Sequence, residues 1–459
     1  MKKKVITIVL SAVLVGSLLT GCGNSSDNET PAEDAGSEAQ TAGDEADAPT
    51  ETEEEALAEG AEGDLAGEIT VYAWTDMYTA SSQVAEAFMK EHPEAKINVE
   101  QVDAAYTKLI PQLASGQDVA DVFMLQNYDL MSFVNTYPGQ ILDVSDLIQG
   151  EESNFAEAAV QSIYNVEDGK YYGVPIDVGP CVFFYRADML EEYGINVEDI
   201  KTWDDYIEAG KVVREKSGGK VYMTGFDFNG QSSQDYVKLL FQQQGGSYYD
   251  ADGKINLNTP EMVKTYETLQ KMIDADIVQN FTSEWDDRVA ALQNETICTL
   301  PYACWIHSII SGQCEDQKGL WSIAPMPTFD GYNGDVFLGG SVFAIAATTE
   351  YPELAKAFVK YELMNPDSAQ YMLPNGQFEA YAPYYDTLVY QEAADYWGIN
   401  IAQEFANHIE APGINFGKFF TDAQSGIKQA SADILIEGKD MTEALDDASA
   451  AAQRSADNK

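Results

Sequence analysis

The feature that most constrains the fold of this chain is the alternation of strand and helix patterns after residue 67. The stretch EITVYAW (Glu68–Trp74) is rich in β-branched and aromatic residues and predicts a strand. A helix that ends near His92 follows it, and the next three predicted elements are a strand, a helix and a strand over Ile97–Asp103, Ala104–Ser115 and Asp121–Leu125. This alternation is typical of a largely parallel sheet covered by helices on both faces, and we expect an α/β fold.

Two later helices begin at recognisable caps. Thr202 precedes a helical pattern with Asp205 three residues on, which is close to a capping box. Thr259 is followed by Pro260, and proline is favoured at the first position of a helix. The chain has 459 residues, so the part after residue 67 is long enough for one large or two medium domains.

The N-terminal segment has the pattern of an export signal. Three lysines precede an apolar run, Val5–Leu19, that is too short to span a bilayer comfortably. The tetrad Leu19-Thr20-Gly21-Cys22 resembles the bacterial lipobox, whose cysteine is lipidated and becomes the new N-terminus. On this interpretation residues 1–22 are a lipoprotein signal peptide, and acyl chains on Cys22 hold the protein on the extracytoplasmic face of the cell membrane. The alternative is an ordinary secretory signal with an incidental cysteine.

Residues 23–67 have the composition of a tether. They contain 15 Asp and Glu residues and no Lys or Arg. Such a segment repels itself and has little apolar surface to bury, so we expect it to be disordered and extended.

Charge and motif content exclude several classes of protein. The formal net charge is −50, which argues against nucleic acid as a partner. The three histidines form no HExxH, no CxxC pair occurs, and there is no GxSxG elbow or P-loop. We therefore expect no metal, no cofactor and no catalytic residues. The motif DADGK (Asp250–Lys254) lacks the spacing of a calcium loop and is better explained as a hairpin turn.

Four cysteines follow Cys22, and their spacing does not reveal whether any pair forms a disulfide. Buried free thiols are the expected state for most of them. They are Cys181, Cys298, Cys304 and Cys314.

From about Glu68 to the C-terminus the order of motifs resembles the extracellular solute-binding proteins of ABC importers, in their carbohydrate-binding, maltose-binding-protein-like branch. The fragments that carry the resemblance are YGVP, FFYRADMLEEYGI, KTWDDYIEAGKVV, TLPYACWIHSII, WSIAPMPTFDG and LGGSVFAIAATTEYPELAKAFVKYEL. The family often has Tyr-Asn where this chain has Tyr185-Arg186, and often has proline after the glycine where this chain has Gly376-Gln377. The second departure lies in a region that commonly lines the ligand pocket.

The resemblance implies a two-lobed periplasmic-binding-protein-like fold, with three crossovers and a ligand cleft between the lobes. The expected organisation is lobe 1 over residues 68–178 and 328–368, and lobe 2 over residues 179–327 and 369–459.

Ligands of open α/β sheets bind beyond the carboxyl ends of the strands. This rule selects Trp74, Thr75 and Asp76 after the first strand and Gln126, Asn127 and Asp129 after the third, and Asp177 lies at the first crossover. The resemblance adds Trp305 as a tryptophan that stacks on a sugar ring and Ser341 in a loop near the cleft. Further candidates for lining the cleft are Gln234, Trp285, Tyr381 and Asn415. Flat aromatic rings, amides and carboxylates suit a sugar, which has apolar faces and a rim of hydroxyls. The alternative for each residue is a packing or capping role.

The expected function is that of a lipid-anchored, monomeric binding protein that hands a carbohydrate to the permease subunits of an ABC transporter. Two alternatives remain open. The same fold can bind a solute that is not a sugar, and paired carboxylates can serve a secreted, lipid-anchored glycosidase.

Overall fold

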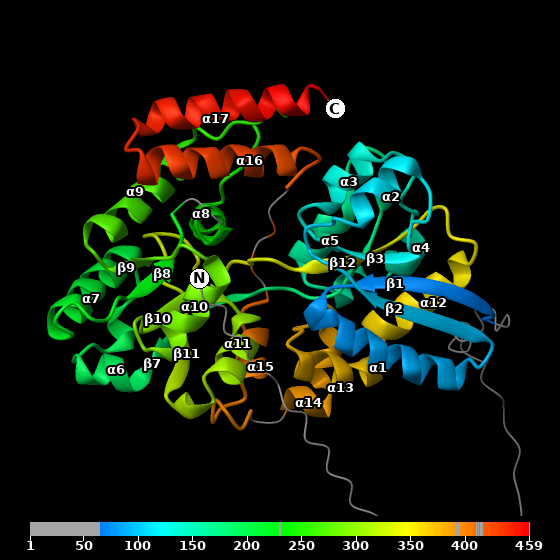
Figure 1. The fold of residues 1–459 in the computed structure, drawn as a ribbon, viewed down its shortest axis with the longest axis horizontal. Helices are drawn as coiled ribbons and strands as arrows, with labels where there is room; N and C mark the ends of the chain where they lie inside the picture. Colours follow the sequence, from blue (N-terminus) through cyan, green and yellow to red (C-terminus); the bar gives the residue numbers. More distant parts are fainter. Residues whose placement is uncertain are drawn as a thin grey trace, which may run out of the picture. The chain divides into compact units, whose positions relative to one another are not determined.

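The computed structural model describes residues 65–228, 231–391, 394–409, 411, 413 and 416–458 (Figure 1). Only the backbone is described for Asp76, Gln231 and Ser232. The predicted signal peptide, Cys22 and nearly all of the predicted tether lie outside the described residues. Within the described ranges, no helix combines the length and the apolar character that a membrane crossing requires.

Lobe 1 contains a five-stranded sheet in the order β2-β1-β3-β12-β6. Strands β1 (Gly67–Ala73), β2 (Ala95–Gln101) and β3 (Val122–Gln126) are parallel, and β12 (Ser341–Ile345) is antiparallel to β3 and to β6 (Val174–Pro175). The three predicted strands are confirmed, each displaced by no more than two residues at either end. Helices α1 (Thr75–Glu91) and α12 (Pro352–Leu363) lie on one face, and α3 (Leu130–Thr136) and α5 (Glu157–Ile163) lie on the other (Figure 1).

The second predicted helix begins later than the sequence indicates. Helix α2 spans Leu109–Ser115, whereas the prediction began at Ala104. Tyr106 has a left-handed backbone with φ 58°, and its hydroxyl donates a hydrogen bond to Asp129 and accepts one from the Gln126 amide, each at 2.9 Å. These tertiary contacts hold Tyr106 outside the helix.

Lobe 2 contains a three-stranded antiparallel sheet in the order β10-β7-β11, and its strands are Thr299–Ala303, Cys181–Arg186 and Trp321–Ala324. A separate parallel pair joins β8 (Thr224–Phe226) to β9 (Val278–Asn280). The parallel arrangement expected from the first predicted strands therefore holds for three strands of lobe 1 and does not extend to the main sheet of lobe 2. The long helices of this lobe are α7 (Trp203–Lys216), α8 (Gln231–Gln243), α9 (Pro260–Asp274), α16 (Phe420–Ser431) and α17 (Met441–Ala456).

The two predicted caps are confirmed. At the start of α7, the Thr202 side chain accepts a hydrogen bond from the Asp205 amide, and the Asp205 carboxylate accepts one from the Thr202 amide. At the start of α9, Thr259 accepts a hydrogen bond from the Met262 amide at 3.2 Å. Each bond satisfies an amide that the first turn of a helix leaves unpaired.

The remaining regular elements are short. The helices are α4 (Ser145–Ile148), α6 (Ala187–Glu192), α10 (Glu284–Gln293), α11 (Ile306–Gln313), α13 (Ala369–Met372), α14 (Leu388–Gln391) and α15 (Ile401–Ala406), and the strands are β4 (Tyr164–Asn165) and β5 (Lys170–Tyr171). Single helical turns lie at Glu152–Asn154, Val197–Asp199, Glu315–Gln317, Pro366–Ser368, Leu373–Asn375, Ala382–Asp386 and Ala432–Ile436.

Three chain segments run side by side between the two sheets. The Leu338 amide donates to the Gly179 carbonyl at 2.8 Å, and the Val178 amide donates to the Phe378 carbonyl at 2.9 Å. These segments match the three crossovers that the resemblance implies. The predicted lobe boundaries stay predictions, and the contacts refine them, since Thr328 pairs with Thr202 of lobe 2 and α13 packs against α1 of lobe 1.

The four cysteines are free and buried. Burial raises the pKa of the Cys298 thiol to about 12 and that of Cys314 to about 11, and it raises the pKa values of Cys181 and Cys304 well above the usual range. Since the thiolate is the reactive form of cysteine, these thiols are inert in the folded protein.

Candidate functional site

The crossover segment 338–341 brings four of the predicted site residues together. Asp177 accepts hydrogen bonds from the Ser341 amide, at 2.8 Å, and from the Ser341 hydroxyl. The Asn127 side-chain amide donates to the Gly339 carbonyl at 3.2 Å, and the indole of Trp305 donates to the neighbouring carbonyl of residue 338, also at 3.2 Å. Side chains from β3, the first crossover and the end of β10 therefore converge on one short segment.

Two glycines make this convergence possible. Gly339 and Gly340 have φ angles of 82° and 109°, which favour glycine. A Cβ atom on Gly340 would lie 2.9 Å from the Asn127 side-chain nitrogen and 3.1 Å from the Asp177 carbonyl oxygen. The close packing of Asn127 and Asp177 against the crossover thus requires a residue without a side chain.

Lobe 2 contributes a wall of aromatic rings. Trp305 is half-buried at the start of α11, with its ring centroid 5.0 Å from Tyr302 and 5.9 Å from Trp285. Trp285, on α10, is 45% exposed. Exposed indole surface beside a half-buried one offers flat apolar area to a ligand.

A buried arginine lies behind this wall. Arg288 is fully buried, and its guanidinium carbon is 4.9 Å from the Trp285 ring and 4.5 Å from the Tyr302 ring. One guanidinium nitrogen is 3.5 Å from a carboxylate oxygen of Glu284. Burial raises the pKa of Glu284 to about 7, although Arg288 opposes the rise.

A second buried ion pair lies on α8. Asp235 accepts a hydrogen bond from the Tyr302 hydroxyl at 2.5 Å, and its other oxygen is 3.0 Å from the Lys238 ammonium. Lys238 also lies 4.8 Å from the centroid of the Tyr128 ring, which belongs to lobe 1. Burial raises the pKa of Asp129 to about 6, opposed by the hydrogen bond from Tyr106 and by the charge of Lys238. The end of β3 in lobe 1 therefore meets α8 of lobe 2.

Several buried polar atoms of this region have no hydrogen-bond partner among the described residues. They are the indole nitrogen of Trp74, the side-chain oxygen of Asn127 and all three guanidinium nitrogens of Arg288. Buried polar groups are nearly always satisfied, so these atoms need an explanation. A polar ligand held between the lobes would satisfy Trp74 and Asn127 of lobe 1, whereas Arg288 stays covered by the rings of Trp285 and Tyr302 and faces Glu284.

The other predicted residues have different placements. Gln126 lies at the end of β3 opposite Ser341, and Gln234 is buried on α8 beside Asp235. Tyr381 lies apart from the residues around the crossover segment 338–341. Its ring is buried against Phe155, and its hydroxyl donates a hydrogen bond to the Glu151 carboxylate at 3.1 Å. The Asp76 side chain and Asn415 lie outside the described residues.

Sequence reasoning missed six residues of this site: Tyr106, Tyr128, Asp235, Lys238, Glu284 and Arg288. Tyr128 could have been found, since it follows β3 like Asn127. Asp235 and Lys238, and likewise Glu284 and Arg288, are opposite charges spaced three or four apart on a helix. That spacing is typical of an exposed helix face, and it gives no sign that these pairs are buried.

A hollow larger than the cavities beside these residues lies elsewhere in the described part of the chain. It has a volume of about 420 Å³, and none of the predicted site residues lines it. The cavity lined by Asn127 and Gly339 holds only about 20 Å³. We place the candidate ligand site at the converging polar groups and not at the larger hollow, because buried polar atoms without a hydrogen-bond partner lie at the former.

The chain matches the model of a protein family described as bacterial extracellular solute-binding protein over residues 73–363. It is 27% identical over 397 residues to a lactose-binding protein of Rhizobium radiobacter, which covers 83% of this chain and 91% of that protein. It is also 27% identical over 287 residues to an arabinooligosaccharide-binding protein of Bacillus subtilis (strain 168), covering 61% of this chain and 65% of that protein.

Solved structures show the same fold. An ABC transporter-associated binding protein of B. animalis subsp. lactis Bl-04, in complex with beta-1,6-galactobiose, has a TM-score of 0.70 at 24% identity, covering 84% of this chain and 96% of that one. The sugar-binding protein MalE of Xanthomonas citri has a TM-score of 0.71 at 17% identity, covering 84% and 97%. The fold is therefore the two-lobed solute-binding fold that the sequence predicts.

Proposed function

Because this chain belongs to the family of bacterial extracellular solute-binding proteins, we propose that it captures a carbohydrate between its two lobes and delivers it to the permease of an ABC transporter. The observation that carries the proposal is the pair of buried polar atoms on Trp74 and Asn127 that have no hydrogen-bond partner among the described residues, together with the exposed indole of Trp285 on the other lobe. The names of relatives that bind lactose and arabinooligosaccharides support a saccharide as the solute.

The geometry suits a sugar in three ways. The apolar face of a sugar ring can stack on Trp305 and Trp285. Sugar hydroxyls can accept a hydrogen bond from the Trp74 indole and can donate to the Asn127 side-chain oxygen. The ligand then contacts polar groups of lobe 1 and aromatic rings of lobe 2 at once, which stabilises the closed arrangement relative to an open one. The permease can recognise that closed arrangement as the loaded state.

A screen by thermal denaturation tests the proposal. Lactose, arabinotriose and maltotriose should be compared with spermidine, which represents a solute that is not a sugar. A saccharide that binds raises the melting temperature with its concentration, because it binds only the folded state. The Trp305→Ala variant should lose most of this increase. An increase with spermidine alone would contradict the choice of a carbohydrate.

We assign the protein no catalytic role, as suits a family of binding proteins. The observation that makes the alternative worth testing is the raised pKa of two site carboxyls, about 6 for Asp129 and about 7 for Glu284, since glycosidases use a carboxyl with a raised pKa as a general acid. Incubation with the same oligosaccharides should release no new reducing ends. Release that disappears in Glu284→Gln would contradict the assignment.

We further propose that the protein acts as a monomer held to the membrane through lipid on Cys22. The support is the lipobox tetrad after an apolar run, followed by an acidic segment that can serve as a tether. Metabolic labelling with palmitate should label the wild-type chain and a Ser26→Ala control, and it should not label Cys22→Ala. A labelled, membrane-bound Cys22→Ala protein would rule out this anchor.

A further inference from the structure

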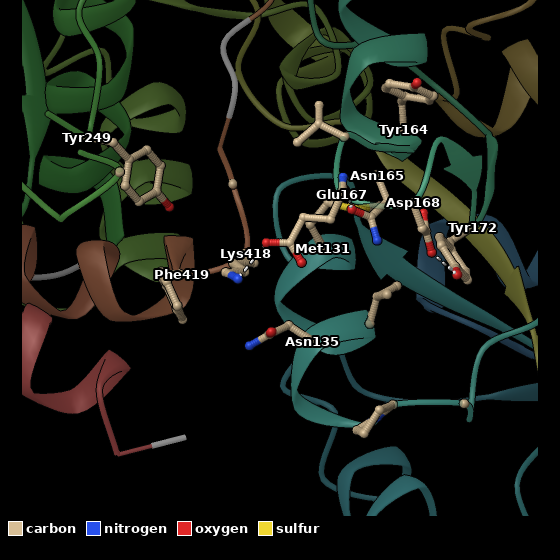
Figure 2. A pocket seen from close by; sticks show the side chains of 16 residues that line it. Met131, Asn135, Tyr164, Asn165, Glu167, Asp168, Tyr172, Tyr249, Lys418 and Phe419 are labelled. Carbon is tan, nitrogen blue, oxygen red and sulfur yellow. Dashed lines mark hydrogen bonds and ion pairs between the residues drawn. The ribbon is translucent and has the colours of Figure 1, made fainter. Parts of the chain in front are cut away.

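The hollow of about 420 Å³ is lined from both lobes (Figure 2). On the lobe 1 side, Met131 and Asn135 come from α3, and residues 164–168 and Tyr172 come from the β4–β5 hairpin and the residues around it. On the lobe 2 side, Tyr249 and residues 417–419 face them. A volume of this size lies in the range of about 300–1,000 Å³ that is common for small-molecule sites.

Aromatic rings stand on both sides of the hollow. Tyr164, which is 38% exposed, and Tyr172 belong to lobe 1, and Tyr249 and Phe419 belong to lobe 2 (Figure 2). The Tyr249 hydroxyl donates to the Phe416 carbonyl at 2.5 Å, which fixes the ring beside the segment that follows. Rings held in place on opposite walls offer flat apolar faces to a ligand.

Polar groups lie between these rings. The Tyr172 hydroxyl donates to Asp168 at 2.6 Å, and Lys418 forms an ion pair with Glu167 at 2.6 Å that joins the two lobes. Each carboxylate keeps further capacity to accept hydrogen bonds from hydroxyl groups. Among the described residues, Asn135 makes no side-chain hydrogen bond, so its amide is free to donate and accept.

The charges in the lining limit the class of ligand. Two carboxylates and one ammonium give a net negative lining, which disfavours phosphate esters and other anions. The single ammonium is engaged with Glu167 and is therefore a poor anchor for a carboxylated ligand. A neutral polyhydroxylated ring, with apolar faces for the aromatic side chains and hydroxyls for the acids and amide, fits this combination best.

We propose that this hollow is a second carbohydrate site, separate from the site at Trp305, and that it binds one or two sugar units. It deepens the proposed function, because it rests on the carbohydrate as the solute of this protein. Since the hollow is lined from both lobes, a sugar bound there favours the arrangement that places Tyr164 and Tyr249 on its opposite walls. An oligosaccharide or a second copy of the transported sugar can therefore contact the protein at two places.

Calorimetric titration of the full chain with lactose, arabinotriose and maltotriose tests this proposal, using three variants. Asn135→Ala/Tyr164→Ala removes one ring and the amide from the lobe 1 wall of the hollow. Trp305→Ala alters the first site. Tyr332→Ala removes a tyrosine that is 44% exposed and lines neither site, so it is the matched control for loss of surface aromatic area.

We expect at least one saccharide to show two binding steps. The weaker step should become about tenfold weaker or disappear in Asn135→Ala/Tyr164→Ala, and it should persist in Trp305→Ala and Tyr332→Ala. The proposal is overturned if every step is the same in the double variant as in the wild type, or if no saccharide binds with two steps. Failure of the proposed function is a different result, namely that no step depends on Trp305.

Discussion

The two halves of the candidate ligand site are built in different ways. In lobe 1 the site residues follow the ends of strands, and Asn127 and Asp177 are held by hydrogen bonds to the backbone or side chain of the crossover. In lobe 2 the rings of Trp285 and Tyr302 cover a fully buried arginine, and the carboxylates that face it come from helices. In lobe 1 the positions of the site residues are set by the ends of the strands. In lobe 2 they are set by charged side chains buried in the interior.

This difference has an energetic meaning. The hydrogen bond from Asn127 to the crossover joins neutral groups and contributes about 0.5–1.5 kcal/mol, and losing it leaves the rest of lobe 1 intact. A buried charge is costly whenever its partner is lost, because the remaining ion cannot be solvated. We therefore expect lobe 2 to be the sensitive half for stability and lobe 1 to be the tolerant half.

The largest expected effect is on the buried arginine. Arg288→Ala should lower the free energy of unfolding by about 3–5 kcal/mol, because it opens space under two rings and leaves Glu284 without its cation. Urea denaturation measures this change. Asn127→Ala should cost about 0.5–1.5 kcal/mol, and the exposed pair member Lys211→Ala about 0–1 kcal/mol. Equal losses in Arg288→Ala and Asn127→Ala would remove the distinction between the two halves.

The crossover that both halves share is the next test. Gly340→Ala should destabilise the protein by about 1–3 kcal/mol, because its φ of 109° and the 2.9 Å approach of the Asn127 nitrogen exclude a side chain. The control is Gly312→Ala, whose Cβ would meet no atom within 4 Å and which lies in helix α11. That change should be neutral or stabilising. Thermal denaturation of both variants distinguishes strain at the crossover from a general intolerance of alanine.

Replacing the half-buried tryptophan should affect binding more than stability. Trp305→Ala should weaken saccharide binding by about 1–3 kcal/mol, the value of stacking on an aromatic ring of comparable area, and keep most of the melting temperature without ligand. Trp203→Ala, which removes a tryptophan that is 2% exposed, should instead cost about 3–5 kcal/mol of stability. If Trp305→Ala unfolds as readily as Trp203→Ala but binds normally when folded, then Trp305 belongs to the core.

The last prediction concerns pH. Burial raises the pKa of Glu284 from its ordinary 4.5 to about 7, so the folded protein holds a proton that the unfolded chain releases between these pH values. The free energy of unfolding should therefore fall as the pH rises from about 4.5 to about 7, and Glu284→Gln should remove this part of the fall.

A buried carboxyl of lobe 1 provides the control for this experiment. Glu362 lies in α12, where it accepts a hydrogen bond from Ser81 at 2.6 Å, and burial raises its pKa to about 8. Glu362→Gln should reduce the same kind of fall between about pH 4.5 and 8. Only Glu284→Gln should also change the pH dependence of saccharide affinity. A change in that dependence in both variants would show that Glu284 acts through overall stability.

The same comparison explains which parts of the molecule could be predicted from the sequence. Strands β1 to β3 and the cap at Thr202 follow from local patterns, and the rule that ligands bind beyond strand ends then selects Asn127. The start of α2 could not be predicted, because Tyr106 leaves the helix to make contacts with Asp129 and the Gln126 amide, which lie some 20 residues away in the chain.

Most residues of the lobe 2 half of the site could not be predicted from the sequence. Trp305 was found because of the resemblance to a family, and Arg288 was missed because its spacing from Glu284 is that of an ordinary exposed ion pair. Tyr381, predicted to line the cleft, packs against Phe155. Burial of a charge is a property of the tertiary fold, and no local pattern encodes it.

The positions of the four cysteines make the rate of thiol modification a measure of the opening of lobe 2 alone. All four thiols lie in lobe 2, at Cys181, Cys298, Cys304 and Cys314, and all are buried. A thiol reagent can modify them only when lobe 2 unfolds locally, so the rate of modification reports how long lobe 2 stays folded. Unfolding that is confined to lobe 1 does not change this rate. The natural sequence thus carries a reporter for one lobe, and a sugar that ties the lobes together should slow it.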